Sequence, residues 1–195
     1  MVHILPHWNW PDRIGKITPV HVFTSGDEAE LFLNGKSLGR KKKGPYEYRL
    51  RWDSVVYQPG ELKAVAYKDG KHWAEEVVKT SGSPAKLTAT IDRNHIIADG
   101  KDLSFISVKV TDDNGLLVPD ASNLIEFSIE GPGEIVATDN GYPYDMTAFG
   151  SHKRKAFEGH ALVIVRSVEG KEGTITVTAR SEHLEGDSVK INTDL

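Results

Sequence analysis

The stretch Glu30-Leu31-Phe32-Leu33-Asn34-Gly35-Lys36-Ser37-Leu38 decides the fold class of this 195-residue chain. Asn34 and Gly35 are residue types that accept positive φ at both central positions of a turn, which a tight type I′ hairpin requires. Short segments flank the pair on both sides. The stretch therefore predicts two antiparallel strands joined by a two-residue turn.

Two further turn motifs follow the same logic. Lys68-Asp69-Gly70-Lys71 lies between the runs Leu62–Tyr67 and Trp73–Val78 and predicts a second tight hairpin. Asn114-Gly115 comes after the run Phe105–Val110 and predicts a third. Frequent turns between short segments are typical of antiparallel β-structure.

Apolar residues recur at every second position in several segments between the turns. A period of two directs alternate side chains to opposite faces of a strand, so such segments predict half-buried strands. The clearest cases are Tyr46–Trp52, Ile106–Val110 and Thr174–Thr178. The short apolar run Ala161–Val165 predicts a strand buried on both faces. Because no long stretch shows a 3.6-residue period, we expect an all-β chain built of β-sandwiches.

A domain boundary is expected at Ser81-Gly82-Ser83-Pro84, where four turn-forming residues separate two alternating segments. The charge balance changes at the same place. Residues 1–83 carry 13 Lys+Arg and 10 Asp+Glu, whereas residues 84–195 carry 11 and 18. We therefore expect two tandem Ig-like β-sandwich domains, residues 1–82 and residues 83–195.

Composition excludes several classes of protein. The chain has no cysteine, which rules out a disulfide framework, a thiolate nucleophile and a cysteine zinc site. Its formal charge of −4 disfavours nucleic acid as a partner. The longest apolar run, Ala161–Val165, is too short to span a bilayer, so no membrane partner is expected. The first residues also lack the basic and apolar regions of a signal peptide.

The N-terminal run His3–Pro11 is the densest cluster of special residues. His3 and His7 have the spacing of metal ligands on a helix, but Pro6 lies between them and opposes a helix, so no metal site is expected. Trp8 and Trp10 would lie on one side of an extended segment. Exposed tryptophans could stack on sugar rings, but packing against a neighbouring domain is the favoured interpretation for Trp8, Trp10 and the adjacent His7.

A polar loop with aromatic residues is expected at Asp139–Asp145. Its amide and tyrosines, Asn140, Tyr142 and Tyr144, are candidates for carbohydrate contact, as is Trp73 in the first half. An ordinary connecting loop would have the same composition. The chain offers no metal-dependent, nucleotide or nucleophile-elbow motif, so no catalytic residue and no cofactor are expected.

Three charged motifs are interpreted as ordinary turns. Arg40-Lys41-Lys42-Lys43 is predicted to be a solvated hairpin tip rather than a phosphate site. The acidic motifs Asp99–Asp102 and Asp112–Gly115 contain oxygen ligands that calcium accepts, but neither has the spacing of a calcium-binding loop. Asp and Asn favour turns in any case, because they bond their own backbone.

A family resemblance rests on stretches spread over both halves. In the first half they are His3–Trp10, Pro19–Asp27, Glu30–Gly39, Trp52 and Tyr57–Tyr67; in the second they are Ala98–Phe105, Val118–Ala121, Phe127–Gly133 and Asp139–Gly141. The first half resembles the DUF4982 module that follows the catalytic barrel in glycoside hydrolase family 2 β-galactosidases of Bacteroidetes type. The second half resembles their following Ig-like C-terminal module.

The resemblance implies a non-catalytic accessory part of such an enzyme, which packs on and supports a catalytic barrel. The two barrel glutamates of a retaining glycosidase have no counterpart here. The implied partners are the catalytic and N-terminal domains of the parent enzyme, and carbohydrate, and the implied location of the parent is the periplasm or cell surface of a bacterium. Two alternatives stay open: a carbohydrate-binding module, and a cell-surface Ig-like spacer. The parent substrate, a β-galactoside, a β-glucuronide or another glycoside, does not follow from these residues.

Overall fold

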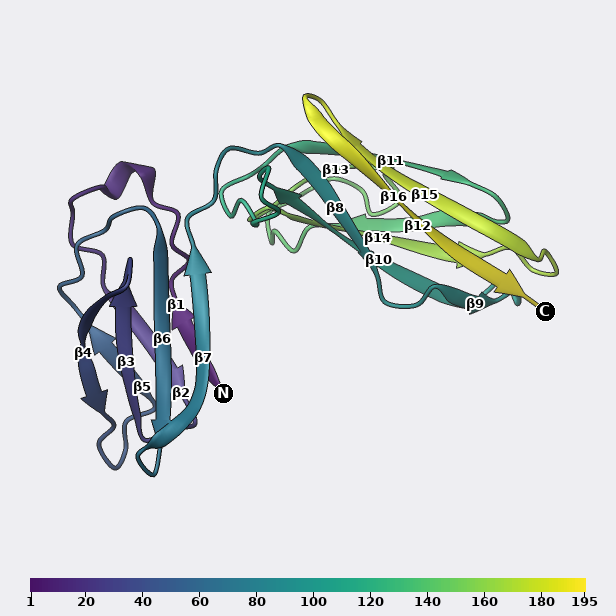
Figure 1. Cartoon of the computed structure of the whole chain (residues 1–195). Helices are drawn as coiled ribbons and strands as arrows, with labels where there is room; N and C mark the ends of the chain where they lie inside the picture. The colour runs from purple at the N-terminus through teal and green to yellow at the C-terminus, as the bar shows by residue number, and fades with distance from the viewer. The chain divides into compact units, whose positions relative to one another are not determined.

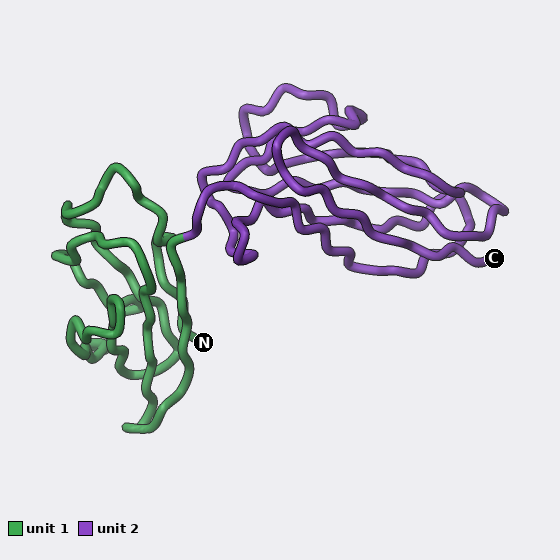
Figure 2. The backbone as a smooth tube through the Cα atoms, turned by 45° about the horizontal axis from the view of Figure 1, so that its top comes forward, with its two compact units in different colours: residues 1–80 green, residues 81–195 purple.

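The computed structural model describes residues 1–195, and the chain divides into two compact units, Met1–Thr80 and Ser81–Leu195 (Figures 1 and 2). Each unit has its own hydrophobic core between β-sheets. Helical structure is limited to the 3-10 turn η1 (Pro11–Arg13). No helix has the length and apolar character needed to cross a bilayer. The predicted all-β fold class is confirmed, and both units are β-sandwiches.

The unit Met1–Thr80 consists of a three-stranded and a four-stranded antiparallel sheet. The first has the order β1 (Val2–Leu5), β2 (Val20–Thr24), β5 (Arg49–Trp52), and the second β4 (Lys36–Lys42), β3 (Glu28–Leu33), β6 (Glu61–Lys68), β7 (Lys71–Lys79). Their inward residues alternate along the strands, as in β3, and form one core. The apolar residues at every second position of the sequence are thus the residues that form this core.

Both tight hairpins of this unit are present. Asn34 and Gly35 join β3 to β4 with φ of 49° and 78°, and Asp69 and Gly70 join β6 to β7 with φ of 50° and 74°. Two consecutive positive φ values are the mark of the predicted type I′ turn. The twist of that turn matches the twist of the strands it connects.

The segment before β5 differs from the expected strand. Leu50 and Trp52 are buried as predicted, but Tyr46 and Tyr48 are exposed and β5 begins only at Arg49. A turn occupies the preceding residues, where the Gly44 N–H donates to the Glu47 carboxylate at 2.7 Å. The alternation of aromatic residues thus includes Tyr46 and Tyr48, which lie before Arg49, the first residue of β5 that pairs with β2.

The basic run is also placed differently from the prediction. Arg40, Lys41 and Lys42 belong to β4, an edge strand whose residues are mostly exposed, and Lys43 follows it. The guanidinium of Arg40 pairs with Glu28 at 2.6 Å and lies over the Tyr67 ring. Antiparallel pairing of β4 with β3 extends through Lys42, despite a register shift between Glu30 and Phe32, and overrides the local preference for a charged turn.

The unit Ser81–Leu195 contains nine strands in two layers. One layer has the order β12 (Gly133–Asp139), β14 (His160–Ser167), β10 (Leu103–Thr111), β8 (Lys86–Ile91), and the other β16 (Leu184–Asp194), β15 (Gly173–Ser181), β11 (Leu124–Glu130), β13 (Lys153–Lys155), with β9 (His95–Ile97) beside β16. A single parallel pair, Lys86 with Glu185, links β8 to β16. The inward residues of both layers form one core.

Alternation predicts this second core well, with two differences. Ile106, Val108 and Val110 are buried as expected. In β14, Leu162 and Ile164 are only partly buried, so the strand alternates and is not buried on both faces. The Asn114-Gly115 turn closes a short loop after β10, but Thr111 and Leu117 form only an isolated bridge, and the next strand, β11, begins at Leu124.

Candidate functional site

Trp8 is a core residue of the first unit and not part of an exposed surface. It is only 1% exposed, and its indole N–H donates to the Gln58 carbonyl at 2.9 Å. Its ring packs 4.9 Å from the ring of Tyr57, while its carbonyl accepts from the Thr80 hydroxyl. The structure therefore corrects the expectation at Trp8: the segment before η1 folds its tryptophan back onto its own domain, because burial of a large aromatic ring is favourable.

Trp10 is partly buried against the core of the first unit, and its ring contacts that of the exposed His7. Their rings stack with centroids 4.3 Å apart, and the Trp10 indole N–H donates to the His7 carbonyl at 2.8 Å. The other histidine of the proposed metal spacing, His3, contacts Glu76 at 3.1 Å. The N-terminal histidines thus each have a contact of their own with another side chain.

Trp73 is 47% exposed on β7, near the turn that connects β6 to β7. Its indole N–H donates to the Ser25 hydroxyl, and the Lys68 ammonium lies 5.0 Å from its ring. Trp8, by contrast, contacts Thr80, which follows the other end of β7. The structure therefore does not bring Trp73 together with the N-terminal aromatic residues.

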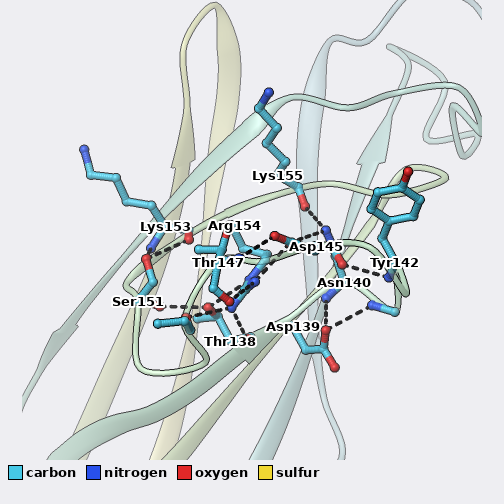
Figure 3. Close-up of polar contacts among 12 residues, drawn as sticks. Thr138, Asp139, Asn140, Tyr142, Asp145, Thr147, Ser151, Lys153, Arg154 and Lys155 are labelled. Atoms are coloured by element: carbon cyan, nitrogen blue, oxygen red, sulfur yellow. Dashed lines mark hydrogen bonds and ion pairs between the residues drawn. The ribbon is translucent and has the colours of Figure 1, made fainter.

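The remaining candidates gather in the second unit around a buried arginine (Figure 3). Arg154 of β13 is 1% exposed and donates five hydrogen bonds. Two go to the hydroxyl and carbonyl of Thr138, one to the Asp145 carboxylate at 3.0 Å, and one each to the carbonyls of Thr147 and Ala148. All five guanidinium N–H groups are thereby used. Arg154 fixes the loop between β12 and β13 from inside.

Asp145 and Asn140 complete this internal network. The Asn140 amide donates to the Asp145 carboxylate at 2.9 Å and to the Lys155 carbonyl at 3.0 Å. The Asp145 carboxylate also accepts from the Thr147 N–H, and this bond, together with Arg154, holds the pKa of Asp145 far below its usual range. The side-chain carbonyl of Asn140 accepts from the Tyr142 N–H at 2.9 Å. Since both ends of its amide group bind protein groups, Asn140 stabilises the conformation of the loop.

The tyrosines of the same loop line a hollow of about 440 Å³. Tyr142 is 42% exposed and its ring packs 4.7 Å from that of Phe157, while Tyr144 is 77% exposed and meets Tyr142 edge-on. Lys153 and Lys155 extend away from Arg154 in Figure 3 and also line the hollow. The volume lies in the range of ligand pockets, and the lining combines aromatic rings with cations.

The sequence placed Asn140, Tyr142, Tyr144 and Asp145 in one polar loop, but it gave no role to Arg154 or Phe157. The strand Lys153–Lys155 is entirely basic, so no apolar alternation marks Arg154 as its inward residue. Only the position of Arg154 between two outward lysines in a paired strand reveals that role, and that pairing is visible only in three dimensions.

The two acidic turns bind their own backbone. Asp99 accepts from the N–H groups of Lys101 and Asp102, which lowers the pKa of its carboxyl. Asp112 accepts from the N–H of Gly82 and from the N–H groups of two residues in its own turn. These bonds, above all the one from Gly82, lower the pKa of its carboxyl. The structure contains no group of three or more His, Asp or Glu side chains arranged to hold a metal ion.

Comparison with known families matches both units. Residues 87–190 match the model of the glycoside hydrolase family 2 C-terminal domain 5, and residues 15–74 match DUF4982, a domain of unknown function. The whole chain is 42% identical to a region of a β-galactosidase, BoGH2A, of Bacteroides ovatus, and spans 22% of that protein.

Solved structures give the same result. A glycosyl hydrolase family 2 member from Bacteroides cellulosilyticus matches 97% of this chain with a TM-score of 0.92 and 36% identity, over 24% of its own length. A β-glycosidase from Bacteroides vulgatus matches 98% of the chain with a TM-score of 0.93 and 32% identity, again over 24% of its length. The chain thus spans about a fifth to a quarter of these relatives.

Proposed function

The chain belongs to the glycoside hydrolase family 2 C-terminal domain 5 family, and we propose that it is a non-catalytic accessory part of a larger family 2 glycosidase. In this proposal the domains 1–82 and 83–195 pack on and support the catalytic barrel of a β-galactosidase-like enzyme. One observation carries it: all of the chain aligns with only 22% of the Bacteroides ovatus β-galactosidase. Most of that enzyme lies outside the aligned region.

Size and chemistry support a non-catalytic role. A catalytic (β/α)8 barrel needs about 250 residues, more than the 195 of this chain. Retaining glycosidases also need two carboxyl groups facing one sugar across a pocket. The carboxylates with lowered pKa in the second unit instead accept hydrogen bonds from backbone N–H groups, or from Arg154 and Arg93.

An apolar patch on the first unit supports docking to another domain. Ile17 pairs with Val56 in an isolated bridge, and Ile14 lies just before it in the same loop. All three side chains are exposed. Adjacent exposed apolar side chains mark a surface that a partner covers.

Complementation tests this proposal. The Bacteroides ovatus β-galactosidase would be shortened by the region that aligns with this chain, and the purified chain would be added back. We expect the added chain to raise the melting temperature or the galactosidase activity of the shortened enzyme, as measured with a chromogenic β-galactoside. The chain alone should turn over neither a chromogenic β-galactoside nor a β-glucuronide.

Paired variants locate the contact. Ile17→Asp places a charge in the apolar patch, so it should abolish complementation. Val77→Asp changes an exposed valine on β7 and should leave complementation intact. Turnover by the isolated chain, removed by a substitution within it, would contradict the non-catalytic role. If both variants changed complementation to the same extent, the apolar patch around Ile17 would not be the contact surface.

A further inference from the structure

The hollow beside Tyr142 and Tyr144 adjoins a second hollow on the same layer. The first is about 440 Å³ and the second about 600 Å³, and Leu124 of β11 lines both. The second is lined further by Glu126, Arg180 and His183. Together they form a surface along β13, β11 and β15, which we call the loop-side groove. Two adjoining hollows suit a chain of linked units better than a single small molecule.

The aromatic end of the groove is held in place from within. Arg154, the buried guanidinium of β13, bonds the loop carbonyls of Thr147 and Ala148, and Asn140 bonds the Asp145 carboxylate. The two tyrosines therefore stand on a loop that its own polar groups already order. A site ordered before binding loses less conformational entropy when a ligand arrives.

Cations line this groove in an otherwise acidic domain. Residues 84–195 carry 18 acidic and 11 basic residues, yet Lys153, Lys155 and Arg180 line the groove. The carboxylates in the lining are Glu126, Glu182 and Asp145, the last of which is bound by Arg154. Lys153 pairs with Glu126 at 2.6 Å. Lys155 and Arg180 make no ion pair, so their positive charges are available to a ligand from solvent.

We propose that the loop-side groove binds an oligosaccharide that carries carboxylate groups. The apolar C–H face of a pyranose ring would lie against Tyr142 or Tyr144, since the negative face of an aromatic ring attracts such polarised hydrogens. A carboxylate on the same or the next sugar would reach Lys155 or Arg180. This binding needs no catalytic barrel, so it goes beyond the accessory role proposed above.

Titration of the full chain tests this inference. The probes are tetragalacturonic acid and its fully methyl-esterified form, which keeps the sugar rings but lacks the charge. By calorimetry, we expect the acid to bind at least about tenfold more tightly than the ester, and its affinity to fall as salt is added.

Substitutions assign the binding to the groove. Tyr144→Ala and Lys155→Met should each weaken binding about three- to tenfold, because each side chain is largely exposed and makes no core contact. Matched controls are Tyr46→Ala on the first unit and Lys109→Met on the other layer of the second, both exposed, and both should bind as the parent chain does.

Three outcomes would overturn the inference. The first is the absence of binding heat for either probe at about 10 mM, a concentration at which even weak sugar sites respond. The second is equal affinity for the acid and the ester. The third is an equal loss of affinity in the groove variants and the control variants. Capture of a protein partner that Lys155→Met does not weaken would likewise count against a glycan. None of these results bears on complementation of the shortened β-galactosidase, so the two proposals can fail separately.

Discussion

Arg154 shows how a charged residue can be a core residue. Its guanidinium is 1% exposed, and every N–H group has an acceptor in the loop it holds. Removing the guanidinium leaves buried carbonyls and the Asp145 carboxylate without hydrogen-bond partners. The resulting loss of folding free energy exceeds the net stability that the intact Arg154–Asp145 pair contributes.

Arg154→Ala is accordingly expected to destabilise the second unit by about 3–5 kcal/mol. Chemical denaturation followed by circular dichroism measures the change. Arg154→Lys keeps the charge but lacks the planar fork, so it should recover only part of the loss. Arg180→Ala, at an exposed position, is the control and should change stability by less than about 0.5 kcal/mol. A similar loss in both alanine variants would show that Arg154 does not organise the loop.

Asp145 makes the stability of the same unit depend on pH. Hydrogen bonds from Thr147 and Arg154 lower the pKa of its carboxyl in the folded chain, so acid favours the unfolded chain, which binds the proton more readily. The stabilisation is complete above the unfolded pKa of about 4 and declines as pH falls below it.

Melting temperatures measured between about pH 6 and pH 2.5 should therefore fall more steeply for the parent chain than for Asp145→Asn. Asp102 and Asp112 have pKa values lowered in the same direction, so the slope should shrink without vanishing. Asp113→Asn removes a carboxylate from an exposed turn and is the control. Parallel curves for the parent and Asp145→Asn would contradict this assignment.

Trp8 has the largest expected effect in the first unit. Trp8→Ala removes a fully buried ring and its bond to Gln58, which should cost about 3–5 kcal/mol. Trp73→Ala, at a half-exposed position, should cost about 1 kcal/mol or less. Denaturant titration with fluorescence compares the two. Equal losses would mean that Trp8 is not buried in solution.

At the scale of elements, the β3–β4 turn depends on glycine. Gly35 has φ of 78°, a region where a Cβ atom is strained by about 1–2 kcal/mol. Gly35→Ala should lower the stability of the first unit by that amount in thermal or denaturant unfolding. Gly44→Ala is a suitable control, because Gly44 has no positive φ and an added Cβ would make only ordinary contact with Glu47. A neutral Gly35→Ala would argue against the type I′ turn.

Secondary-structure elements were predictable where the local residue pattern and the strand pairing in the sheet agree. Both type I′ hairpins and the alternating strands Ile106–Val110 and Thr174–Thr178 follow from residues a few positions apart, and the structure contains them. The alternation at Tyr46 and Tyr48 failed because a strand also needs a partner, and β2 pairs only with Arg49–Trp52. Partners distant in sequence leave no such local pattern.

The candidate site was predictable only in part for the same reason. The tyrosines and Asn140 could be named because polar loops rich in aromatic residues are visible in the sequence. Arg154 could not, since its burial depends on β13 pairing with β11 and on carbonyls from a loop that precedes it. Trp8 was expected to pack against a neighbouring domain, because nothing local shows that its segment folds back over Gln58 and Tyr57 of its own unit.

For the whole molecule, two separate cores lead to a prediction about folding. Each unit buries its own set of apolar residues between its own sheets. The domains proposed as 1–82 and 83–195 should therefore each fold when produced alone. Calorimetry of the full chain should show Trp8→Ala lowering one transition and Arg154→Ala lowering the other. A single transition shifted by both variants would contradict independent folding.

The two basic strands β4 and β13 have a consequence for solubility. Both lie at the edge of a sheet, where unpaired N–H and carbonyl groups invite a strand from another molecule. Lysine and arginine side chains along such an edge, such as Lys41 and Lys42 of β4 and Lys153 and Lys155 of β13, repel an identical edge. These cations therefore oppose edge-to-edge association of two molecules, and neutralising them is expected to favour aggregation before it affects folding.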